Sequence, residues 1–100
     1  MIVLLLVASA AGLGYKTGDD LLQLCSQSRP ACVGYVLGVA DGFSNYRSNA
    51  SLNGTYCIPS GVSGGQITNV VIKYLLDHPK DRHHLAASLV EVAFEKVFSC

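Results

Sequence analysis

Apolar residues after Ser63 recur at spacings of three and four, which is the period of one face of an α-helix. The repeating positions are Ile67, Val70, Val71, Tyr74 and Leu75. Ser63 and Gln66 fit a capping box, in which the serine hydroxyl accepts from the Gln66 amide and the glutamine side chain reaches back. Pro79 cannot continue the pattern. We therefore predict an amphipathic helix that begins after Ser63 and ends before Pro79.

Two more helices are predicted, a short one after Thr17 and one near the end of the chain. Thr17 can cap a helix over the following residues, and Asp19 and Asp20 place negative charge on its first turn, where the helix dipole favours it. Pro30 ends this helix and suits the first turn of the next. The last helix runs from about Leu85 to about Phe98. Its expected inner positions are Ala86, Leu89, Val90, Ala93 and Val97, with Glu91, Glu95 and Lys96 outside.

A central helix is predicted from about Pro30 to about Tyr46, and it carries a stripe of glycines. Gly34, Gly38 and Gly42 recur at every fourth residue and therefore lie along one side of the helix. An apolar face flanks the stripe, formed by Cys32, Tyr35, Val36, Val39 and Phe43. A glycine stripe lets another backbone approach closely. The stripe indicates either tight helix packing within the domain or a seam for a second copy or another partner.

The overall pattern is that of a small all-α protein. The chain has 100 residues, which is enough for one domain, and no alternating strand pattern is present. Seven basic and seven acidic residues give a formal net charge of zero, so a nucleic-acid partner is not indicated. The central apolar run is about ten residues long, whereas a membrane span needs about twenty. We expect a disulfide-stapled bundle of about four helices with no membrane span after the leader is removed.

The first ten residues read as a signal peptide. An unbroken apolar run from Ile2 to Val7 precedes Ala8, Ser9 and Ala10, the small-residue pattern of a signal-peptidase site. The usual basic residues at the start are missing. We predict cleavage after residue 10, which leaves residues 11–100 as a single exported domain, and we predict a periplasmic location.

Four cysteines in a short exported chain favour disulfides over free thiols. On one continuous helix Cys25 and Cys32 would lie about 10 Å apart along the axis, too far for a bridge, but the break at Pro30 allows the chain to fold back. We favour Cys25–Cys32 and Cys57–Cys100 among the three connectivities. Free buried thiols in a cytosolic protein are the alternative. No Cys-x-x-Cys pair indicates zinc, and paired cysteines leave no nucleophile, so neither a cofactor nor an enzyme is expected.

The most polar segment lies between the last two predicted helices. It consists of Asp77, His78, Pro79, Lys80, Asp81, Arg82, His83 and His84. A solvated turn, a protein-contact loop and a metal site are the three interpretations. The side chains of His83 and His84 are expected to point apart because the residues are adjacent, and no recognised ligand spacing is present. As a contact loop, the segment offers both donors and acceptors, and Arg82 is the best single candidate for binding a partner.

A set of short motifs occurs in a fixed order along the chain. Its members are Leu21-Leu22 before Cys25, Cys32-Val33-Gly34-Tyr35, Gly38-Val39-Ala40-Asp41, Cys57-Ile58-Pro59, Gly61-Val62, Gly65-Gln66, Tyr74-Leu75, His78-Pro79, Arg82-His83, Ala86-Ala87, Leu89-Val90, Phe98 and Cys100. This ordered set resembles the Rap/Tai family of type VI secretion immunity proteins. The resemblance covers about residues 17–100, and it departs at Ser99, where Pro is expected before the last cysteine.

The resemblance implies a small periplasmic all-α protein with disulfides, often dimeric. Characterised members of the family bind and block a peptidoglycan-cleaving amidase, and the loop that corresponds to residues 77–84 is implicated in plugging the amidase cleft. The expected function is therefore that of an exported immunity protein. An envelope protein of the same fold with another partner and a histidine-based metal binder are the alternatives.

Overall fold

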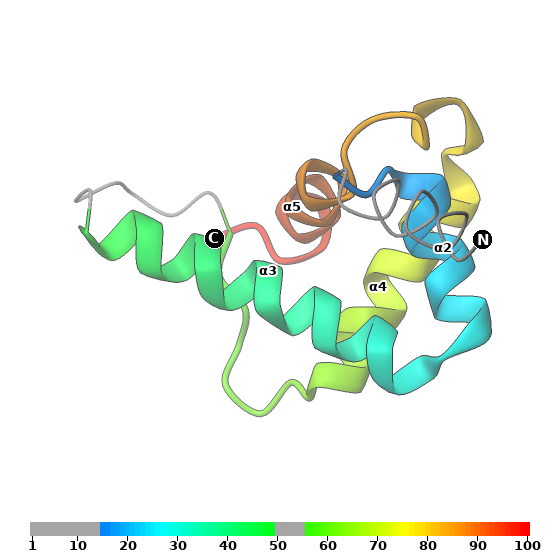
Figure 1. Cartoon of the computed structure of the whole chain (residues 1–100). Helices are drawn as coiled ribbons and strands as arrows, with labels where there is room; N and C mark the ends of the chain where they lie inside the picture. The colour runs from blue at the N-terminus through cyan, green and yellow to red at the C-terminus, as the bar shows by residue number, and fades with distance from the viewer. Residues whose placement is uncertain (1–14, 50–55) are drawn as a thin grey trace, which may run out of the picture.

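The computed structural model describes residues 15–49 and 56–100, with side chains over 15–43 and 56–100 (Figure 1). Those ranges contain four α-helices, one short 3₁₀ helix and no strand; the only β-type pairing is an isolated antiparallel bridge between Thr17 and Leu85. The elements are α2 (Gly18–Gln27), α3 (Arg29–Asn49), α4 (Gly64–Asp77), η1 (Pro79–Asp81) and α5 (Ala86–Val97). The all-α prediction is confirmed. The predicted signal peptide lies outside the described residues.

Local capping explains where α2 and α4 begin. The Asp20 amide donates to Thr17 Oγ1 at 3.2 Å, and the Thr17 amide donates to Asp20 Oδ2 at 3.0 Å. At α4, the Gln66 amide donates to Ser63 Oγ at 3.1 Å and the Ser63 amide donates to Gln66 Oε1 at 2.7 Å. Each pair satisfies two backbone donors reciprocally. The capping box predicted at Ser63 is confirmed, and Thr17 forms a second one.

Side chains from all four α-helices form one core. The helices bury Leu21, Val36, Val71, Leu75, Val90 and Phe94 completely. The predicted inner face of α5 is correct except at its end, where Val97 is 56% exposed and Phe94 is buried instead. Phe94 lies one turn after Val90 on the same face, whereas Val97 is the last helical residue, and the chain leaves the helix at Phe98.

The helix α3 is the longest element, and its C-terminal part extends beyond the other helices (Figure 1). Its apolar face is as predicted: Cys32 and Val36 are fully buried, and Tyr35, Val39 and Phe43 are packed against the core. The ring of Tyr56 lies 6.0 Å from that of Phe43 and 5.3 Å from that of Phe94. None of the helices over residues 15–49 and 56–100 is both long and apolar enough to cross a membrane.

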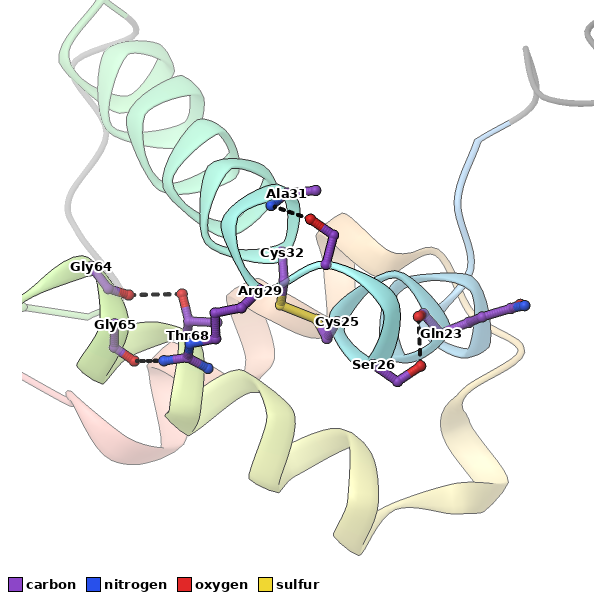
Figure 2. The surroundings of a disulfide bond; sticks show 10 residues. Gln23, Cys25, Ser26, Arg29, Ala31, Cys32, Gly64, Gly65 and Thr68 are labelled. Atoms are coloured by element: carbon purple, nitrogen blue, oxygen red, sulfur yellow. Dashed lines mark hydrogen bonds between the residues drawn. A yellow bond between two sulfur atoms is a disulfide. The ribbon is translucent and has the colours of Figure 1, made fainter.

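Two disulfides cross-link the chain, in the pairing that the sequence analysis favours. Cys25 and Cys32 join α2 to α3 across the sharp bend between them, with Cα atoms 4.7 Å apart (Figure 2). Cys57 and Cys100 join the segment before α4 to the C-terminus, with Cα atoms 5.0 Å apart. The bend also brings Arg29 to α4, where its Nη2 donates to the carbonyl of Gly65 at 3.2 Å (Figure 2).

Candidate functional site

The segment between α4 and α5, residues 77–84, forms an ordered turn. It lies at the edge of the molecule far from the extended end of α3 (Figure 1). Three backbone hydrogen bonds close it: Asp81 N to His78 O at 3.0 Å, Arg82 N to Pro79 O at 3.5 Å, and His84 N to Asp81 O at 3.0 Å. The backbone of the segment predicted as a contact loop is thus held by its own hydrogen bonds.

The start of α2 holds this turn from the other side. The amides of Gly18 and Asp19 donate to the carbonyls of His84 and Arg82, both at 2.9 Å, and the Ala86 amide donates to Lys16 O at 2.8 Å. The first amides of a helix have no partner within it, so the turn supplies acceptors that α2 lacks. A Cβ on Gly18 would lie 3.0 Å from both Cα and O of Arg82, so this close approach requires glycine.

Arg82 has internal contacts rather than a free guanidinium. Its Nη1 donates to the carbonyl of Leu75 in the last turns of α4 at 3.1 Å. Its Nε lies 3.1 Å from Asp19 Oδ1, an ion pair whose N–H is not aligned well enough to count as a hydrogen bond. The side chain is only 23% exposed. The suggestion that Arg82 is the main binding residue stays a prediction, and the side chain has a structural role that the sequence did not reveal.

The histidines of the turn are arranged differently from expectation. The rings of His83 and His84 lie 4.0 Å apart, centroid to centroid, so the expectation that they point apart is wrong. That expectation fits an extended chain, whereas here the backbone curves between Asp81 and His84. His83 Nδ1 lies 3.0 Å from Lys80 O, and His78 stacks on Tyr74 at 3.9 Å. Lys80, His83 and His84 remain exposed and can reach a partner.

The other polar residues of the turn do not assemble into a metal site. Asp77 pairs with Lys73 at 2.9 Å on the surface of α4, one helical turn away. In the part of the chain that the structure describes, no group of three or more His, Cys, Asp and Glu side chains could hold a metal ion. The turn instead presents separate donors and acceptors, which is suited to contact with another protein.

A groove beside the turn was not predicted. The apolar side chains of Leu85, Leu89 and Val92 line it from α5 and from the residue before it. Polar side chains complete the lining: Tyr74, Asp81, His84 and Ser88. Burial raises the pKa of the Tyr74 hydroxyl, and the nearby Asp81 carboxylate raises it further. Leu85 is 51% exposed on this surface as the residue just before α5, whereas the sequence pattern placed it at the start of the last helix.

The glycine stripe has open space beside it in the described fold. A Cβ built on Gly34, Gly38 or Gly42 meets no described atom within 4 Å, although Gly38 and Gly42 line a hollow with residues of α5. Tight packing of the stripe within the domain therefore stays a prediction. The three glycines lie on an exposed side of α3, away from the face that buries Cys32 and Val36. The glycines that do meet neighbours closely are Gly18, at the turn, and Gly64, whose Cβ would lie 3.1 Å from Leu37 Cδ1. The alternative prediction, a seam for a second copy or another partner, stays open.

Comparison with known proteins agrees with this arrangement. A family model described as Rap1a immunity proteins matches residues 17–100, which include both disulfides, all four described helices and the turn. No match was found among curated proteins or among solved structures. The matched region begins at the Thr17 cap and ends at the last bridged cysteine, so it includes every residue that the structure describes except Tyr15 and Lys16. The chain belongs to the Rap1a immunity protein family.

Proposed function

We propose that this protein is an exported immunity protein that binds and inhibits a peptidoglycan amidase delivered by a type VI secretion system. Membership of an immunity family over residues 17–100 implies an inhibitor that binds an effector protein and has no catalytic role of its own. The amidase as target, and occlusion of its active-site cleft as mechanism, are the specific parts of the proposal. The ordered turn over residues 77–84 is the observation that carries them.

The turn has the properties that a plug needs. Its backbone is fixed by internal hydrogen bonds and by the first amides of α2, so little conformational entropy is lost on docking. Lys80, His83 and His84 are exposed at its tip and offer hydrogen-bond donors to a polar cleft. Pro79 opens the short helix η1 and restricts the chain further.

Export to the periplasm forms part of the same proposal. All four cysteines are paired in the structure. Disulfides persist in oxidising compartments such as the bacterial periplasm, where the peptidoglycan substrate of an amidase also lies. Intact mass and peptide mapping of protein recovered from the periplasm without reductant would test this. Four alkylatable cysteines would contradict it.

Inhibition should be tested with variants that leave the fold intact. The Lys80→Ala, His83→Ala double variant removes exposed side chains from the tip, and Lys96→Ala removes an exposed lysine from the end of α5 as a matched control. Each protein is titrated into the amidase encoded beside its gene, with peptidoglycan fragments as substrate. We expect the double variant to inhibit more weakly at an unchanged melting temperature and the control to inhibit normally.

Two results would change the proposal. If the double variant inhibits as well as the parent, the turn is not the inhibitory element, and the exposed face of α3 becomes the next candidate surface. If the parent inhibits no amidase encoded beside it, the amidase as target is lost, although membership of the immunity family stands.

We also propose that the open glycine stripe of α3 is a contact between two copies of this protein. Gly34, Gly38 and Gly42 are exposed, and no described atom lies where their side chains would be. Backbones can approach closely along such a stripe. Light scattering of the parent and of Gly38→Leu tests this, because a bulky side chain on the stripe should separate the copies.

A further inference from the structure

The groove next to the turn is lined by apolar side chains and by one acidic residue, Asp81. Leu85 is 51% exposed, and Val92 is half-buried beside it. Asp81 lines this groove and also a second hollow, which residues 77–80 line as well. The side chain that fits here has an aliphatic portion for Leu85 and Val92 and a cationic end for Asp81. Lysine and arginine have both.

The carboxylate of Asp81 has no partner within the described fold. It makes no ion pair and no side-chain hydrogen bond with any residue of the described ranges. The two basic residues next to Asp81 in the chain do not form an ion pair with its carboxylate. The guanidinium of Arg82 contacts Asp19 and the carbonyl of Leu75, and Lys80 is exposed without an ion pair among the described residues. An opposite charge nearby stabilises the ionised form of a half-buried carboxylate, and the attraction between the two charges is stronger when water is displaced from between them.

The walls favour arginine over lysine. Tyr74 and His84 place aromatic rings along the groove, and a planar guanidinium can stack on such rings while it binds a carboxylate with two parallel hydrogen bonds. Ser88 adds a hydroxyl acceptor on α5. The amide of Ala86 donates to the carbonyl of Lys16, and the amide of Gly18 donates to the carbonyl of His84, so backbone bonds fix the chain on both sides of Leu85 and the groove is formed before anything binds.

We infer that this groove receives an arginine side chain of the effector protein, and that it extends the contact surface from the turn onto α5. The inference rests on the proposed function for the identity of the partner protein. The chemistry of the groove can be tested without that partner.

The first experiment uses small probes and the full chain with its disulfides intact. Nα-acetyl-arginine methylamide is titrated into ¹⁵N-labelled protein, with the citrulline and norleucine analogues as probes that lack the charge. We expect arginine alone to shift the amide signals of Asp81, His84, Leu85, Ser88 and Val92. Equal shifts with citrulline or norleucine, or no localised shift with arginine, would overturn the inference.

The second experiment removes the charge from the groove. Asp81→Asn should weaken arginine binding roughly tenfold, because one charge pair is lost from a partly desolvated site. Asp77→Asn is the matched control: it removes the same charge from the same turn but from the exposed pair with Lys73. Unchanged binding by Asp81→Asn would contradict the inference. If that variant does not fold, Ser88→Lys, which places a competing cation on an exposed groove position, should abolish arginine binding.

The same variants separate this inference from the proposed function. If the parent inhibits the amidase and Asp81→Asn inhibits equally well, the groove has no role in recognition and the inference fails alone. If no amidase is inhibited while the arginine probe binds and depends on Asp81, the proposed target fails and the groove remains a binding site for a basic side chain.

Discussion

The guanidinium of Arg82 reaches from the turn between α4 and α5 back to α2, where its Nε lies 3.1 Å from Oδ1 of Asp19. The same guanidinium donates through Nη1 to the carbonyl of Leu75. One side chain therefore links the end of α4 and the start of α2 at the edge of the fold. The energetic weight of the two contacts differs. Asp19 is 66% exposed, so the ion pair contributes little, whereas the bond to Leu75 satisfies a carbonyl near a helix end.

Arg82→Ala is accordingly expected to lower the free energy of unfolding by about 1–3 kcal/mol, mainly through the carbonyl of Leu75, which loses its charged donor. Chemical denaturation of the purified protein measures this. Lys80→Ala is the control, since its side chain is exposed and forms no ion pair among the described residues. Equal loss of stability in both variants would show that the guanidinium does not hold the turn.

A pair of glycine substitutions tests which glycines the fold requires. Gly18→Ala should lower stability by about 1–3 kcal/mol, because its Cβ would lie 2.5 Å from Leu89 Cδ1 and 3.0 Å from the Arg82 backbone. Gly38→Ala should raise the stability of the monomer by up to about 1 kcal/mol, because alanine favours the helix and no described atom opposes it. Thermal melts at low protein concentration compare the two. A higher melting temperature for Gly18→Ala than for Gly38→Ala would contradict the described packing.

The bulkier change at the same site addresses association. Gly38→Leu should leave the monomer folded, since the space around the position is open in the described structure. If two copies meet along the stripe, the variant should be monomeric by light scattering where the parent is dimeric. The dimer proposal is contradicted if the parent is monomeric. It is also contradicted if the variant associates as the parent does, because the two copies then do not meet along the stripe.

The two disulfides should differ in their response to mild reductant. Both cysteines of the Cys57–Cys100 bridge are exposed, whereas Cys32 is fully buried in the other bridge. Thiolate attack requires access, so Cys57 and Cys100 should be alkylated first in a reduction series followed by mass spectrometry. Loss of this bridge removes a 43-residue constraint, worth about 4 kcal/mol in the chain-entropy model, against about 2.5 kcal/mol for Cys25–Cys32. Reduction of Cys25–Cys32 before Cys57–Cys100 would contradict the order that the burial of Cys32 predicts.

Acid should weaken the cap of α2. The backbone amide of Thr17, and then its hydroxyl, hold the pKa of Asp20 below its ordinary value of 3.8. Because the pKa of Asp20 is lower in the folded state than in the unfolded state, the ionised carboxylate stabilises the fold at any pH above its ordinary pKa. This stabilisation is lost as the pH falls below that pKa. The melting temperature of Asp20→Ala should therefore lie below that of the parent near neutral pH, and the gap should narrow below pH 3.8. Gln23→Ala, an exposed and non-titrating change on α2, should show a gap independent of pH.

The sequence alone determined the features that depend on neighbours within one turn of the chain. Thr17 and Ser63 mark two helix starts through bonds to residues three positions away, and Pro30 and Pro79 mark breaks by their own geometry. The sequence also favoured the cysteine pairing that the structure has, because the break at Pro30 lets the chain fold back and bring Cys25 close to Cys32. The ordered set of small motifs was enough to indicate the immunity family before any contact was known.

The tertiary structure decided everything that depends on what lies opposite a residue. Gly18 and Gly38 are both glycines of predicted helices. Only Gly18 meets another backbone, because α2 abuts the turn, whereas no described atom lies within 4 Å of a Cβ built on Gly38. Arg82 reads as a free basic residue in sequence, but folding brings Asp19 and the carbonyl of Leu75 to its guanidinium. The groove at Asp81 exists only because α4, the turn and α5 meet there. Such contacts join residues distant in the chain, and local periodicity carries no information about them.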